Sequence, residues 1–118
     1  MEPLELTKTI AKILDKKKAL DIKAIKIKDL SIIADYFVIA TGTSTTQVKS
    51  LADEVEYELT KLGLEPNKTE GYQSSTWVVL DYYDVIVHVF CGEQREFYSL
   101  ERLWADGQPV DLSDVVTG

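Results

Sequence analysis

The chain has 118 residues, 45% of them hydrophobic, with 13 basic and 20 acidic side chains and a formal net charge of −7. This length suits one domain with a core of its own, and a second domain is not expected. No apolar run approaches the ~18 residues of a membrane-spanning helix, and the acidic charge disfavours nucleic-acid phosphate while it favours a cationic partner.

The first ten residues, MEPLELTKTI, carry acids where a targeting peptide carries basic residues, and they lack an apolar h-region. The sequence therefore gives no support for export or organelle import, and it predicts a cytoplasmic protein. Cys91 is the only cysteine, which excludes an intrachain disulfide and a thiolate-rich metal cluster. We interpret it as a small apolar filler at a strand end.

Apolar side chains at helical spacing predict a first helix over residues ~3–18. Residues 22–27 are rich in β-branched side chains, and Ile25 and Ile27 alternate with lysines as in a half-exposed edge strand. Residues 36–40 lack such alternation, which predicts a central strand covered on both faces.

The segment from Ser44 to Gln47 has the form of a capping box at a helix start. The helix that follows has one apolar stripe, made of Val48, Leu51, Ala52, Val55, Leu59 and Leu62. Gly63 stands where a left-handed helix cap is needed, so it marks the end of the helix.

The second half of the chain predicts a loop, a hairpin, a helix and a tail. Residues 64–75 form the loop, which includes a short extended piece. The hairpin joins strands 77–82 and 85–90 at Tyr83 and Asp84, a helix spans 94–104, and residues 107–118 form a loose acidic tail. The order of elements predicts an α/β fold, a mixed β-sheet packed with α-helices. Strand 36–40 and the hairpin can be parallel neighbours because the long helix provides the crossover.

The hairpin has two contrasting sides. On one side the pairs are Tyr82 with Val85, Leu80 with Val87, and Val78 with Val89, which predicts core. On the other side the pairs are Asp81 with Ile86, Val79 with His88, and Trp77 with Phe90. Two interpretations of this second side stay open: an exposed surface for a partner, or a face that a helix of this chain covers.

Two signals suggest an enzyme, and neither is complete. The turn from Thr41 to Ser44 leads into a helix start, where backbone N–H groups either hold a phosphate or simply cap the helix. Nucleotidyl transfer also needs carboxylates two apart in a strand, and Asp81 and Asp84 are three apart. His88 has no nucleophile motif beside it and no second histidine for zinc. The sequence therefore predicts no enzyme, no metal and no cofactor.

An ordered set of motifs resembles the ribosome-silencing factors of the Iojap family over nearly the whole chain. The motifs are Asp35–Ser44, Glu70–Gly71, Trp77–Tyr82, Val87–Phe90, Glu93 and Arg95–Tyr98. The resemblance implies a nucleotidyltransferase-like topology without the catalytic carboxylates. It also implies binding to the large ribosomal subunit through its basic protein number fourteen, with little direct nucleic-acid contact. That binding blocks subunit association and represses translation.

The resemblance implies where the partner binds. The contact surface is similar in position to the second hairpin, which here carries Trp77, Leu80, Asp81, Tyr82 and His88, with Arg95 and Tyr98 as neighbours. Leu80 and Tyr82 fall on the predicted core side, so either the strand end opens to solvent or the register differs. Tyr83 departs from the family, which usually has glycine there, and predicts a longer or strained turn. Pairing with a second copy of the free chain is a further alternative.

Overall fold

A computed structural model describes residues 1–30, 32–92 and 106–117. The helix predicted over 94–104 lies outside these ranges. Along the described chain the elements are α1 (Pro3–Lys16), β1 (Leu20–Lys26), β2 (Tyr36–Gly42), α2 (Thr45–Lys61), β3 (Lys68–Glu70), β4 (Trp77–Asp81), β5 (Val85–Cys91) and β6 (Gln108–Pro109).

Local chemistry explains where the two described helices start and stop. Pro3 stands at the first turn of α1, where a missing N–H costs nothing, and Lys18 leaves the helix with a φ of 63°. At α2, Ser44 Oγ accepts from Gln47 N at 3.1 Å, and Gln47 Oε1 accepts from Thr43 N and from its hydroxyl. The predicted cap by Ser44 is confirmed, while the return bond of Gln47 goes to Thr43 and not to the backbone N–H of Ser44.

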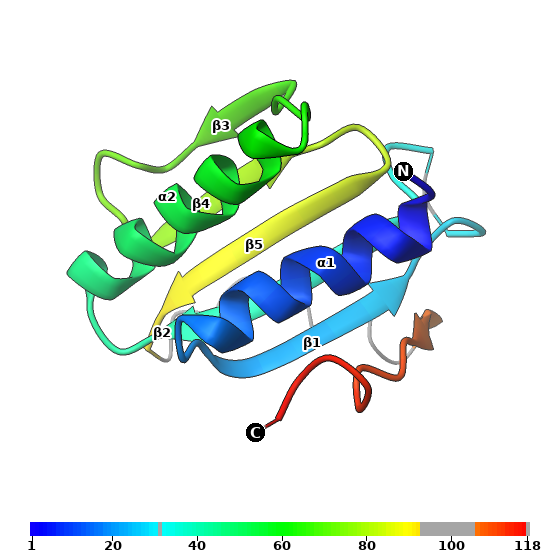
Figure 1. The fold of residues 1–118 in the computed structure, drawn as a ribbon, viewed down its shortest axis with the longest axis horizontal. Coiled ribbons are helices and arrows are strands. Elements are labelled where there is room, and N and C mark those ends of the chain that lie inside the picture. Colours follow the sequence, from blue (N-terminus) through cyan, green and yellow to red (C-terminus); the bar gives the residue numbers. More distant parts are fainter. Residues whose placement is uncertain (31, 93–105, 118) are drawn as a thin grey trace.

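The strands form a mixed sheet in the order β3-β4-β5-β2-β1-β6 (Figure 1). Strands β2 and β5 are parallel, with Tyr36 opposite Val85 and Gly42 opposite Cys91. The other strand pairs of the described chain are antiparallel. The predicted mixed sheet and the parallel neighbours are therefore confirmed, while the nucleotidyltransferase-like topology stays a prediction.

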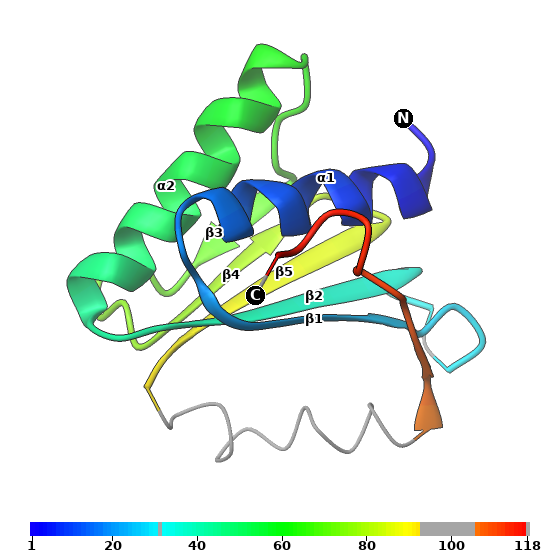
Figure 2. The same cartoon turned by 60° about the horizontal axis from the view of Figure 1, so that its bottom comes forward.

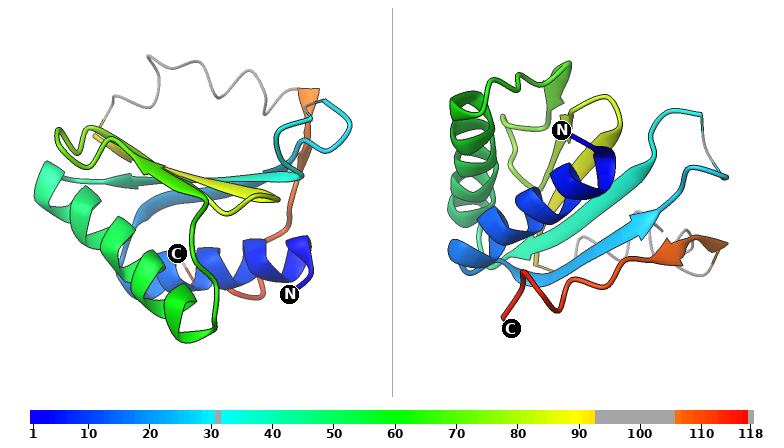
Figure 3. Two further views of the ribbon diagram at one scale, coloured as in Figure 1. Left: turned by 90° about the horizontal axis from the view of Figure 1, so that it is seen from above. Right: turned by 45° about the vertical axis from the view of Figure 1, so that its right-hand side comes forward.

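Both described helices lie on one face of the sheet (Figure 3, left). The apolar stripes of α1 and α2 pack there on alternate residues of the strands, and Val38, Val78, Leu80, Val87 and Val89 are fully buried. The opposite face has a second buried cluster, made of Ile25, Ile27, Ala34, Phe37, Ile39, Ile86 and Phe90, with Trp77 and Val79 packed against it. Leu62, predicted on the buried stripe, is 55% exposed because α2 ends at Lys61.

Strand β1 is not the edge that the alternation predicts. Its outer side pairs with β6, where Ile25 lies opposite Pro109 and Lys26 opposite Gln108. Ala24 and Ile25 point to opposite faces and both are fully buried. The prediction of an edge strand is wrong because a segment far along the chain completes the sheet.

The predicted loop over 64–75 contains the short extended piece, β3, which pairs with β4. Gly71 follows it with a φ of 88°, and a Cβ there would lie 2.0 Å from the backbone oxygen of Trp77. No other residue fits so close to a neighbouring backbone, so Gly71 fixes the chain where β4 begins.

The hairpin keeps two central turn residues. Tyr82 N donates to Val85 O at 2.9 Å, and Tyr83 adopts a φ of 69°. That left-handed conformation is unfavourable for a bulky side chain. The turn is therefore strained rather than longer, which settles the alternative that the sequence leaves open.

The C-terminal segment is packed, not loose. It runs from the edge of β1 to α1 (Figure 2, orange and red). Val110 N donates to Ala24 O at 2.9 Å, Leu112 is buried at 9% exposure, and Lys8 pairs with Asp114 at 3.0 Å. The prediction of a loose acidic tail is wrong because three valines and a leucine among the acids pack against the core.

Candidate functional site

The second side of the hairpin lies on the sheet face opposite α1 and α2. The register places Trp77 opposite Phe90, Val79 opposite His88 and Asp81 opposite Ile86, as the alternation predicts. Trp77, Val79 and Asp81 are partly buried on β4. Their β5 partners are buried, so the outer strand of the pair supplies the accessible surface.

Four rings form an aromatic cluster on this face: Trp77, His88, Phe90 and Phe37. Trp77 stacks on Phe90 with centroids 5.3 Å apart and on His88 at 5.9 Å. Phe37 meets His88 edge to face at 4.6 Å. Such ring contacts add to the burial of area and fix the relative orientation of the rings.

Phe37 is a member of the cluster that the sequence analysis does not single out. The parallel register places Phe37 opposite Ile86 on β5, and that register brings it within reach of His88. Strand β2 is apolar on both faces and shows no alternation, so only the parallel pairing with β5 tells which face Phe37 serves.

His88 is 5% exposed, and its imidazole is held neutral. Its Nδ1 accepts a hydrogen bond from Trp77 Nε1 at 3.1 Å. Burial lowers the pKa of His88 to about 4 because the charged form loses its hydration. Nε2 is buried and has no partner among the residues that the structure describes.

Leu80 and Tyr82, both in the predicted contact surface, lie on the helix side of the sheet. Leu80 is fully buried and Tyr82 is 5% exposed. Burial raises the pKa of the Tyr82 hydroxyl, and Glu56 and Glu65 add to the rise. The alternation prediction that both belong to the core is confirmed, and their burial gives no support to a direct partner contact.

Asp81 is partly buried at the end of β4. Its Oδ1 accepts from Tyr83 N at 2.8 Å, so the carboxylate also stabilises the turn. Arg95 and Tyr98, the predicted neighbours of the contact surface, lie outside the described residues. The structure thus brings Trp77, Asp81 and His88 onto one face and separates Leu80 and Tyr82 from them.

Three backbone donors at the turn from Thr41 to Ser44 and at the start of α2 bind within this region. Thr43 N binds Gln47 Oε1, Gln47 N binds Ser44 Oγ, and Val48 N binds Ser44 O at 2.9 Å. A Cβ on Gly42 would lie 2.9 Å from Val48 Cγ2, so the turn is packed against α2. These contacts are those of a capped and packed helix start, so they agree with the capping interpretation.

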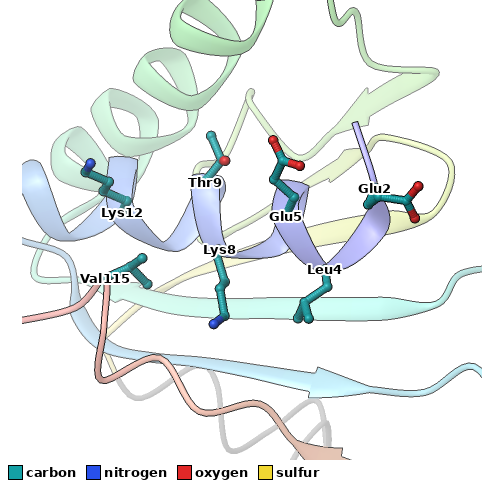
Figure 4. Close-up of a pocket in the computed structure, with 7 residues that line it drawn as sticks. All are labelled: Glu2, Leu4, Glu5, Lys8, Thr9, Lys12 and Val115. Atoms are coloured by element: carbon teal, nitrogen blue, oxygen red, sulfur yellow. The ribbon is translucent and has the colours of Figure 1, made fainter.

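Other features of the described chain are less informative. An open depression lies along α1, where Lys8 and Leu4 point toward the C-terminal segment while Glu5 and Lys12 point away (Figure 4). Its side chains do not converge on one point. Within residues 1–30, 32–92 and 106–117, no group of three or more His, Cys, Asp or Glu side chains is arranged to hold a metal ion. None of the described helices combines the length and the apolar character needed to cross a membrane.

The fold and this face define a class of small α/β proteins with a mixed sheet, helices on one face and an aromatic cluster on the other. Comparison with known proteins gives the family. Residues 1–117 match the family described as "Ribosomal silencing factor during starvation". The chain belongs to that family, which confirms the resemblance seen in its motifs.

Individual relatives agree with this assignment. A ribosomal silencing factor from Halalkalibacterium halodurans is 38% identical, with 99% of this chain and 100% of that protein covered. A crystal structure of a Chromobacterium violaceum protein superposes with a TM-score of 0.85 at 34% identity, covering 100% and 95% of the two chains. A mouse protein named "Mitochondrial assembly of ribosomal large subunit protein 1" is 32% identical, covering 80% of this chain and 43% of that protein.

Proposed function

We propose that this chain is a ribosome-silencing factor that binds the large ribosomal subunit and keeps the small subunit from joining it. The observation that carries the proposal is the partly exposed Trp77, held by an aromatic cluster on a strand face, in a chain that matches the silencing-factor family over residues 1–117. The names of the relatives support a role at the ribosome, and the mouse name points to its large subunit.

The proposed contact is the basic protein number fourteen of the large ribosomal subunit, which is the partner that the family resemblance implies. A formal charge of −7 suits such a partner, because opposite charges speed encounter and select among partners. Trp77 is the proposed anchor and Asp81 a charged neighbour, and the family resemblance adds Arg95 and Tyr98 to the proposed contact. Leu80, Tyr82 and His88 support these contacts from within the fold.

The proposed mechanism is steric. A factor bound where the subunits meet excludes the small subunit without any covalent chemistry, so the chain acts in the cytoplasm as a translational repressor and not as an enzyme. The free chain can also pair with a second copy through the same face, and binding to the ribosome then competes with that pairing.

Co-sedimentation with purified large subunits tests the proposal. The wild-type chain is expected to sediment with large subunits and to reduce their association with small subunits in a sucrose gradient. If it does neither, the proposal is wrong. Light scattering of the free chain, with and without Trp77→Ala, measures self-association separately.

Trp77→Ala is expected to weaken binding by about 2 kcal/mol, roughly 30-fold in Kd, as for an aromatic anchor at an interface. Tyr57→Ala is the control, because Tyr57 is an aromatic residue on α2 that is 60% exposed and lies on the helix side of the sheet. Binding titrations measure both. An unchanged Kd in a folded Trp77→Ala variant removes Trp77 from the contact.

A further inference from the structure

His88 is an unusual residue for its position. It lies on the central strand β5, and the neighbouring positions of that strand on the same face are Ile86 and Phe90. A buried polar side chain is tolerated when its hydrogen bonds are made, and here only one ring nitrogen has a described partner. An apolar ring would fill this position at lower cost.

The one hydrogen bond defines the state of the imidazole. An indole N–H can only donate, so Nδ1 of His88 must offer a lone pair to Trp77 Nε1 at 3.1 Å. The neutral ring then carries its proton on Nε2, the buried atom without a described partner. The residue thus keeps an acceptor aimed at Trp77, while its donor meets no partner in the part of the chain that the structure describes.

The cluster restrains the indole in two ways. Stacking on Phe90 at 5.3 Å and 21° sets the plane of the indole ring. Stacking alone does not choose between the two orientations related by a flip about χ2, because either face of the indole can lie over Phe90. The hydrogen bond to Nδ1 supplies that second restraint, and Phe37 holds the imidazole edge to face at 4.6 Å.

We propose that His88 is a positioning residue, which fixes the orientation in which Trp77 meets its partner and does not touch the partner itself. This inference rests on the proposed function, since it assigns a role within the same contact. Its motivation is the 5% exposure of His88 beneath a partly exposed Trp77. Fixing an anchor before binding removes an ordering cost from association.

Two variants of His88 separate the effect of its hydrogen-bond acceptor from the effect of its side-chain volume. His88→Phe keeps a ring and removes the acceptor. His88→Asn restores an acceptor, because Asn Oδ1 is attached to the same side-chain carbon position as Nδ1. We expect His88→Phe to weaken binding to large subunits about 3- to 10-fold, the value of one freed side chain, and His88→Asn to recover most of that loss.

A spectroscopic measurement reports the orientation directly. The indole N–H resonance of Trp77, assigned with a Trp77→Phe variant, is expected to shift in His88→Phe and to stay near its wild-type position in His88→Asn. Thermal unfolding of each variant shows that the chain is folded. If the two variants bind equally weakly, the acceptor has no role and the inference is wrong.

A double-mutant cycle tests whether His88 acts only through Trp77. In a Trp77→Ala background, His88→Phe is expected to cause no further loss of affinity. An additional loss means that His88 acts by another route, which overturns the inference. If the wild-type chain does not bind large subunits, the proposed function fails and the inference with it; if wild type and His88→Phe bind alike, only the inference fails.

Discussion

A single titratable side chain lies inside the apolar face of β5. This side chain is His88, its neighbours in the aromatic cluster are three uncharged rings, and burial lowers its pKa. A buried imidazole of this kind couples the stability of the sheet to the acidity of the solution.

The wild-type chain is expected to lose stability on mild acidification. In the unfolded chain His88 takes up a proton near its ordinary pKa of about 6.5, whereas in the folded chain its pKa is about 4. The unfolded state therefore binds more protons between these values, and stability falls as pH falls. From about pH 7 to about pH 5 the expected loss is about 2 kcal/mol.

Urea unfolding at the two pH values measures this loss, and His88→Phe is the control because it lacks the imidazole. Between the two pH values, the free energy of unfolding of His88→Phe should fall by about 2 kcal/mol less than that of the wild-type chain. Parallel behaviour of the two proteins would contradict a neutral, buried His88.

At the scale of elements, the hairpin of β4 and β5 carries both the proposed contact and a local strain. Tyr83 is 62% exposed, so its ring contributes little packing, yet its φ of 69° is one that side chains rarely adopt. The carbonyl of Asp84 accepts from Asp35 N and Tyr36 N, which ties the turn to the start of β2. These hydrogen bonds stabilise the turn and so keep Tyr83 in its strained conformation.

Tyr83→Gly is expected to stabilise the chain by about 0.5–1 kcal/mol, because glycine adopts a positive φ without a Cβ clash. The greater conformational entropy of glycine in the unfolded chain offsets only part of this gain. Tyr83→Ala is the matched control, since it removes the ring but keeps the Cβ. Chemical denaturation compares the three proteins. A gain in the alanine variant as large as in the glycine variant would show that the ring, not the backbone, is the cause.

The sequence predicts elements well where the signal is local. The cap by Ser44, the stripe of α2 from Val48 to Leu59 and the hairpin register depend on neighbours within a few residues, and all three are confirmed. It predicts the candidate site in part. Alternation places Trp77 and His88 on one face, but their hydrogen bond needs two side-chain rotamers that no sequence pattern specifies.

At the scale of the whole molecule, the C-terminal segment closes one edge of the sheet. It adds β6 to β1, and Leu112, Val115 and Val116 then pack on the helix side. The sequence misses this because the segment is short and acidic, and because its partners are nearly a chain length away. Long-range pairing of short segments leaves little pattern to detect.

Leu112→Ala is expected to destabilise the chain by about 2 kcal/mol, as a buried leucine truncated in a core does. Asp114→Ala is the control, because Asp114 forms an exposed ion pair with Lys8 in the same segment and its loss should change stability by less than about 0.5 kcal/mol. Denaturation midpoints measure both. A small effect at Leu112 would contradict the packing of this segment.

The parallel pairing of β2 with β5 has a consequence for how the chain reaches its fold. The most buried strand of the sheet, β5, comes late, and its pairing with β2 must close a long loop that contains α2, β3 and β4. Such closure costs entropy before any contact repays it. During synthesis, the amino-terminal half of the chain therefore lacks its central strand, and the sheet assembles only after Cys91 has emerged from the ribosome that synthesises the chain.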